Sequence, residues 1–214
     1  MAPHIITASL VFVIGFVTGW FCNIIIYKLS QSRARVFAEI TNGVMFALLY
    51  LRFGLCLELI FYCAFISVLL IIAVIDLKRM IIHDAMTAVL SIIALIMLFV
   101  LKLPVKEQIL GAVVGFSAFF CIYWIARAIY KREAFGLGDV FLMGAAGLFL
   151  GFKSAVFTLM FSFYIALIAI IILKIFRVKL KLSQEIPFGP FICAGACIAL
   201  FFGESIMDFY FGLI

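Results

Sequence analysis

Apolar residues run along this 214-residue chain in long uninterrupted stretches, and short polar segments separate them. A helix that crosses the hydrocarbon core of a bilayer needs about 20 apolar residues. The pattern predicts helical spans at 5–27, 38–53, 55–76, 84–101, 107–130, 139–152, 154–176 and 186–203. We therefore expect an all-α integral membrane protein, in which residues 1–214 form a single polytopic domain of about eight transmembrane helices.

Composition and charge add an orientation to this picture. The chain is 69% hydrophobic and only 12% charged, which is unlike a soluble globular domain. Lysine and arginine concentrate on the cytoplasmic side of membrane proteins, so their placement predicts an N-terminus outside and the following loop inside. Twelve of the 16 basic residues then lie on the inner side: Lys28, Arg33, Arg35, Lys78, Arg79, Arg127, Lys131, Arg132, Lys174, Arg177, Lys179 and Lys181. This bias explains the net charge of +6 without a nucleic-acid partner.

Cysteine and histidine do not form a metal-binding pattern. The six cysteines are scattered through apolar spans without a CxxC pair, and they are expected to be small buried hydrophobes. Cys193 and Cys197 share a helix face, but no further cysteine or histidine lies nearby in the sequence. The two histidines, His4 and His83, fall on opposite sides of the predicted membrane. We therefore expect no metal.

Two aspartates stand in unusual positions on the inner side. Asp76 ends the apolar run "ISVLLIIAVID", where its charge would face the negative end of its own helix dipole. Asp139 is predicted to start a helix, where an aspartate is a favoured N-cap. Gly136 and Gly138 precede it in "GLGD", and glycine is placed where the chain turns tightly or another group comes close.

Both aspartates lie at the same predicted edge of the membrane. If Asp76 and Asp139 converge, they can share a proton, so that one acts as general base and the other as general acid. Such a pair can activate water against a peptide bond without metal, serine or cysteine. Spacing alone leaves a second reading open, in which the two carboxylates only cap helices or reach to the membrane surface.

Several segments resemble one known family, the type IV prepilin peptidases, which are membrane aspartyl proteases of the GxGD type. The similar segments are "GLGD" followed by "FLMGAAGLFLG", "IDLKRMIIHD", "GFVTGWFCNIIIYKL", "FAEITNGVMFALLYLRFG" and "IPFGPFICAGACIALFFG". They cover nearly the whole chain in the family's order. The resemblance implies a multi-pass protein of the bacterial inner membrane with catalytic Asp76 and Asp139 in an active-site loop containing Gly136 and Gly138.

The implied substrates are type IV prepilins or pseudopilins, cut at the cytosolic membrane face behind a short basic leader. Since the inner face is itself basic, recognition is expected to rest on the substrate's apolar helix and on local acids such as Glu133 or Glu185. Asp84 is a further candidate, expected to act mainly as an N-cap. Membrane lipid is the other expected partner, and the sequence does not give the oligomeric state.

Two departures from the family matter for chemistry. A short cytosolic loop, 28–38, replaces the family's zinc-binding segment with its two CxxC pairs. Bifunctional members also N-methylate the new N-terminus with S-adenosylmethionine, and the missing segment puts that activity in doubt, while proteolysis needs no cofactor. His83 stands where the family usually has proline, and its role is open.

Other classes of protein remain as alternatives. A non-catalytic membrane protein, such as a proton-coupled transporter or a helper subunit, would use Asp76 and Asp139 as proton-relay groups. A relay is expected near the bilayer midplane, whereas these residues lie at its edge. Among proteases, the related archaeal preflagellin type and the intramembrane signal-peptide type are the second alternative.

Overall fold

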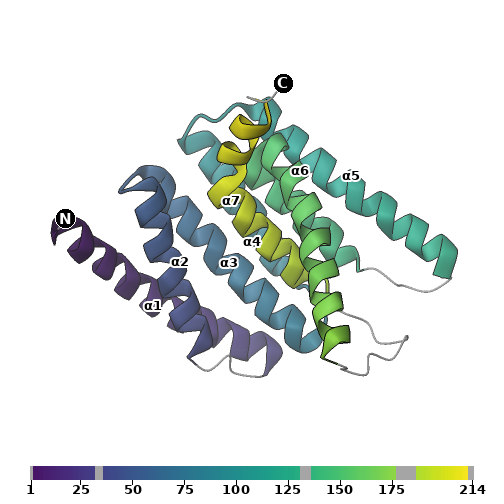
Figure 1. Cartoon of the computed structure of the whole chain (residues 1–214), viewed down its shortest axis with the longest axis horizontal. Helices are drawn as coiled ribbons and strands as arrows, with labels where there is room; N and C mark the ends of the chain where they lie inside the picture. The colour runs from purple at the N-terminus through teal and green to yellow at the C-terminus, as the bar shows by residue number, and fades with distance from the viewer. Residues whose placement is uncertain (1, 32–35, 131–135, 177–186, 212–214) are drawn as a thin grey trace.

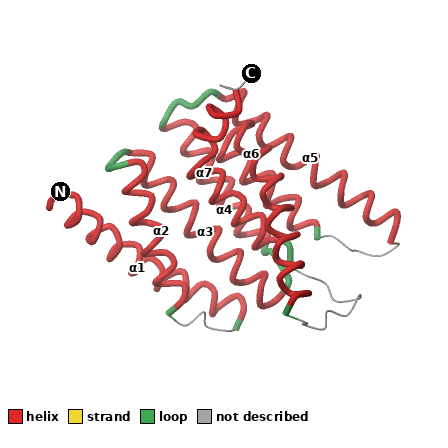
Figure 2. The backbone as a smooth tube through the Cα atoms, viewed as in Figure 1, coloured by secondary structure: helices red, strands yellow, loops and turns green. Residues whose placement is uncertain are grey.

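The computed structural model describes residues 2–31, 36–130, 136–176 and 187–211, and these contain helices and no strand (Figure 2). The helices are α1 (Ala2–Ser30), α2 (Phe37–Phe53), α3 (Leu57–Arg79), α4 (Asp84–Val100), α5 (Val105–Tyr130), α6 (Leu137–Ile175) and α7 (Gly189–Phe211). They pack side by side in one bundle, with α1 and α2 on one flank and α5 on the other (Figure 1). The predicted all-α class is confirmed.

Helix α6 contains a sharp break at the position where the sequence pattern predicted a loop between two separate spans. Gly151 has φ of 79° and ψ of 172°, and glycine is the residue that adopts such a backbone without strain. The first arm packs along α5, where Gly115 meets Met143. Beyond the break the chain turns back, because Phe163 lies 5.9 Å from Phe119, one helical turn after Gly115. The predicted spans 139–152 and 154–176 are therefore the two arms of α6.

Both flanks of the bundle are closed by glycine contacts. On one flank, Gly15 and Gly19 of α1 lie against Phe46 and Glu39 of α2, where any side chain would overlap. On the other flank, the backbones of Gly111 in α5 and Gly147 in α6 touch. Small residues at such crossings let helices approach closely enough for packing to hold them together in lipid.

A buried polar residue joins the first three helices. The Asn42 side chain donates to the Gly15 carbonyl at 3.0 Å and to Thr18 Oγ1 at 2.8 Å, and its oxygen accepts from Ser67 Oγ at 3.1 Å. Nearby, Asn23 Nδ2 donates to Glu39 Oε1 at 2.9 Å. Because a buried polar group is costly unless it is hydrogen-bonded, these bonds fix how α1, α2 and α3 sit together.

The surface of the bundle suits a lipid environment. Within the part of the chain that the structure describes, four helices are long and apolar enough to cross a membrane, namely α1, α3, α5 and α6, and the shorter helices α4 and Gly189–Gly203 are also apolar. Large hydrophobic side chains such as Leu10, Ile60, Phe99 and Ile125 are exposed on them. The last turns of α1, α3, α5 and α6 each carry basic residues, and Arg79 Nε donates to the Ser30 carbonyl at that end of the bundle. The sidedness of the membrane stays a prediction.

The α5–α6 contact yields a stability test. Gly147→Ala places a methyl group on the Gly111 carbonyl, so it forces the two helices apart. Overpacking of this kind costs about 1–3 kcal/mol, which corresponds to a loss on the order of 5 °C in the midpoint of thermal unfolding. At Gly144, one turn earlier, an added Cβ lies 3.3 Å from Phe116 Cβ, so Gly144→Ala should lose less. Equal midpoints for the two purified variants would contradict this packing.

Candidate active site

Asp76 lies in the last turn of α3, which continues to Arg79, three residues beyond the predicted end of this span. Its side chain is buried, with 4% of its surface exposed. Its Oδ2 accepts a hydrogen bond of 2.9 Å from the backbone N–H of Gly189, the first residue of α7. The carboxylate that opposes the dipole of its own helix therefore lies at the N-terminus of another, where a negative charge is stabilised.

Asp139 is the third residue of α6 and not its N-cap, so this part of the prediction is wrong. The N-cap is Gly136, which lacks a side chain to cap the helix. The Asp139 side chain reaches back toward it, because a Cβ on Gly136 would lie 3.2 Å from Asp139 Oδ2. Asp139 is 7% exposed, and its Oδ1 is buried without a hydrogen-bond partner among the described residues.

The two aspartates converge, as the hypothesis of a carboxylate pair requires. Ile82 packs both against Gly138, the neighbour of Asp139, and against Gly189, whose N–H binds Asp76. Cys193 lies one turn into α7 from Gly189, whose N–H binds Asp76. The ends of three helices, α3, α6 and α7, therefore meet around the pair. The catalytic role of Asp76 and Asp139 remains a prediction.

Ile82, in the turn between α3 and α4, packs against two glycines of the site. A Cβ on Gly138 would lie 2.8 Å from Ile82 Cβ, and a Cβ on Gly189 would lie 3.1 Å from Ile82 Cδ1. The glycine at position 138 was expected to let another group come close. That group is the Ile82 side chain, next to the carboxylate pair. Met80, in the same turn, adopts a left-handed backbone with φ of 54° that ends α3, and its N–H donates to the Asp76 carbonyl at 2.8 Å.

The remaining predicted site residues contribute less or cannot be placed. Asp84 is exposed and is the first residue of α4, whose N-cap is His83 without a side-chain bond, so the expected cap at Asp84 is wrong. Glu133 and Glu185 lie outside the described residues. No group of three or more His, Cys, Asp or Glu residues that could hold a metal occurs within the described ranges.

Sequence reasoning missed Gly189 as a site residue. Its signal was its place in "PFGP" at the start of the last span, where a glycine between two prolines marks a fixed backbone entering a helix. The motif was used only as one of the segments that resemble the family, and no role was predicted for its glycine. The contact with Asp76 joins residues 113 positions apart, which no local pattern reports.

Fold and site together define a helical membrane protein with a buried carboxylate pair at one end of its bundle. The chain belongs to the Type IV leader peptidase family, whose sequence pattern matches residues 63–172.

Curated relatives that bear the name prepilin leader peptidase/N-methyltransferase support this membership. The protein of Aeromonas salmonicida (strain A449) is 31% identical over 150 residues, covering 69% of this chain and 50% of the relative. That of Bacillus subtilis (strain 168) is 31% identical over 182 residues, covering 81% and 68%. That of Burkholderia pseudomallei (strain K96243) is 28% identical over 152 residues, covering 71% and 46%. The chain thus spans about half the length of several of its curated relatives. No solved structure matches it.

Gly189→Ala tests whether the backbone of α7 positions Asp76. The added Cβ would lie 2.7 Å from Asp76 Oδ2, so the carboxylate must move. Since a shift of about 1 Å in a catalytic group can cost on the order of 10²-fold in rate, we expect peptidase activity to fall by about that factor.

Gly195→Ala is the matched control on the same helix. Its Cβ would lie 2.7 Å from Ser162 Oγ, an equally tight contact away from the aspartates. Both variants should lose thermal stability, but Gly195→Ala should keep its activity at a temperature where it is folded. If activity followed stability in both variants, Gly189 would have no positioning role.

Proposed function

We propose that this protein is a membrane aspartic endopeptidase that removes the leader peptide of type IV prepilins or pseudopilins at the cytosolic face of the bacterial inner membrane. One observation carries the proposal: at the basic end of the bundle, Gly189 binds Asp76, and Ile82 packs against both Gly189 and Gly138, the residue before Asp139. Membership of the Type IV leader peptidase family and the names of the relatives support the same activity.

Hydrolysis by such a pair requires one carboxylate and one carboxylic acid. The carboxylate takes a proton from water, and the water oxygen attacks the carbonyl carbon of the scissile bond. The carboxylic acid gives its proton to the carbonyl oxygen, forming a neutral tetrahedral diol. Transfer of a proton to the amide nitrogen then breaks the C–N bond, releasing the leader with a new carboxyl group and the remaining protein with a new amino group.

The surroundings of the two carboxylates support a division of roles between them. Asp76 accepts an N–H bond from Gly189, and such a bond stabilises an ionised carboxylate. Asp139 Oδ1 has no donor among the described residues, an arrangement that suits a protonated carboxyl. Asp76 is therefore the general base and Asp139 the general acid at the start of the reaction.

Methylation of the new N-terminus is part of the relatives' names, and S-adenosylmethionine is its expected donor. That molecule carries hydroxyl, ammonium and carboxylate groups, each of which needs a polar partner in its site. The described residues line one cavity of 220 Å³ between α2, α3 and α7 and another of 410 Å³ between α4, α5 and α6, both mainly apolar. These cavities do not fit the cofactor, so no methyl-transfer step is assigned to them.

Neutralising either aspartate should abolish cleavage. Asp76→Asn or Asp139→Asn removes a proton-transfer group, each worth roughly 10²–10⁴-fold in rate, and the shared mechanism fails when one member is lost. Cleavage of a recombinant prepilin by the purified variants in detergent, followed by electrophoresis, is the measurement. Asp84→Asn is the control, because Asp84 is exposed at the start of α4 and its loss should be mild. Near-normal cleavage by either of the first two variants would rule out the pair.

Proteolysis should not depend on metal. The proposed chemistry uses two carboxylates and water, so treatment with a chelator should leave the cleavage rate unchanged. Metal analysis of the purified protein should find no stoichiometric zinc. Loss of activity in chelator that added zinc restores would contradict the mechanism.

A further inference from the structure

An apolar groove, here the α2–α3–α7 groove, runs along the bundle beside the carboxylate pair. Its volume is 220 Å³, and side chains of α2, α3 and α7 line it. Phe37, Leu77 and Pro190 form its end near the site, and Met45, Ile66 and Cys197 form the opposite end. Because the lining residues come from three helices that run side by side, the groove follows the direction of the helices.

The groove is continuous with the candidate active site. Leu77 and Pro190, which line it, directly follow Asp76 and Gly189, whose hydrogen bond fixes the site. Ala73 and Cys193 also line the groove, one helical turn from Asp76 on α3 and from Gly189 on α7. A chain that leaves the near end of the groove therefore passes the carboxylate pair.

The lining suits an apolar helix. Four small side chains leave the depression between larger residues of α2 and α3, namely Ala73, Cys193, Ala194 and Cys197. In lipid, apolar surfaces gain nothing from leaving water, so helices associate by close packing at small residues. A row of bulky apolar side chains from a second helix would gain such contacts here.

The length of the groove also fits a transmembrane segment. On α3 the lining extends from Ile66 to Leu77, which is roughly 16 Å at 1.5 Å per residue. This is about half of a hydrocarbon core of about 30 Å. A helix bound there would be held over its inner half, with its cytosolic end at Asp76.

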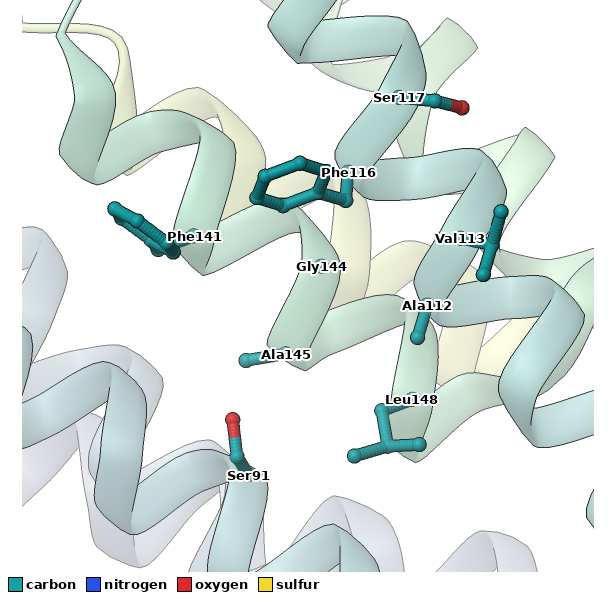
Figure 3. A pocket seen from close by; sticks show the side chains of 9 residues that line it. All are labelled: Ser91, Ala112, Val113, Phe116, Ser117, Phe141, Gly144, Ala145 and Leu148. Carbon is teal, nitrogen blue, oxygen red and sulfur yellow. The ribbon is translucent and has the colours of Figure 1, made fainter.

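A second and larger cavity lacks this continuity. The α4–α5–α6 cavity, of 410 Å³, lies over Gly144 and Ala145 of α6, between Ser91 of α4 and Ala112 and Phe116 of α5 (Figure 3). Phe141 lies nearest in sequence to Asp139 among its lining residues, but it is exposed on α6 while Asp139 is buried. This cavity provides a matched control for the groove.

We propose that the α2–α3–α7 groove binds the apolar helix of the prepilin substrate and delivers the bond at its cytosolic end to Asp76 and Asp139. This inference rests on the proposed function and adds the surface that recognises the substrate. Because apolar side chains line the groove, it would bind the substrate's helix through packing and not through charge. Substrates with different leaders would then bind in the same way.

Filling the groove should weaken recognition of the substrate's apolar helix but not recognition of its leader and cut site. Ala194→Leu places a larger side chain in the groove, and Ala112→Leu makes the same change in the α4–α5–α6 cavity. The substrates are a full-length recombinant prepilin and a shortened peptide that keeps the leader and cut site but lacks the distal part of the apolar helix.

For Ala194→Leu we expect kcat/KM on the full-length prepilin to fall about tenfold or more, since one methylene in an apolar pocket changes specificity by roughly 10–200-fold. Its kcat/KM on the shortened peptide should stay near that of the unsubstituted protein, and Ala112→Leu should leave both values near normal. Equal losses on both substrates, or no loss on either, would overturn the proposal.

Photo-crosslinking tests binding independently of cleavage. Phe37, 63% exposed in the groove, is replaced by benzoylphenylalanine, and Val113, 55% exposed in the other cavity, serves as control. Both are made with Asp139→Asn, mixed with full-length prepilin in lipid vesicles and irradiated. A crosslink from position 37 to the prepilin's apolar helix, absent from position 113, supports the groove. Crosslinks to lipid alone overturn it. A crosslink together with a wild-type protein that cleaves no prepilin would refute the proposed peptidase function while the groove still stands.

Discussion

The hydrogen bond from the Gly189 N–H to Asp76 is the interaction on which the rest of the site depends. The first N–H groups of a helix have no partner within it, and within a bilayer they need one from the protein. Asp76 meets this need for α7, which explains a carboxylate in the last turn of α3. Only glycine fits at 189, because a Cβ would lie 2.7 Å from Oδ2. Pro190 lacks an N–H where no helical partner exists, so it adds no cost.

The sequence predicted the elements better than their contacts, for physical reasons. Each span is a local apolar run, and every predicted span overlaps a helix in the described ranges, with 139–152 and 154–176 falling on the single helix α6. The contact of Asp76 with Gly189 depends on packing between α3 and α7, and no local pattern contains it. Asp139 was misplaced as an N-cap because Gly136, also a favourable N-cap residue, starts the helix earlier. The common edge of the two aspartates had left their convergence as one of two readings, beside separate roles at their own helix ends.

The break at Gly151 affects where the carboxylate pair lies in a membrane. The first arm of α6, from Leu137 to the break, is roughly 20 Å long at 1.5 Å per residue. A hydrocarbon core of about 30 Å is longer than this arm, so one of its ends must lie within the apolar layer. At one end of this arm Asp139 is buried, with 7% of the residue exposed. At the other end, Gln108 Nε2 would lie 3.4 Å from a Cβ on Gly151.

The position of the pair favours the proposed peptidase chemistry over a proton relay. A relay needs polar groups that continue across the membrane, whereas Asp76 and Asp139 lie within the last and first turns of their helices. The buried hydroxyls farther along α6 do not extend a path: Thr158 and Ser162 donate to carbonyls one turn earlier in their own helix, at 2.8 Å and 2.6 Å. These two hydroxyl protons are therefore already used in hydrogen bonds within α6. A carboxylate pair confined to one edge instead suits a substrate that reaches that edge, where a helix leaves the bilayer and its peptide bonds become accessible to water.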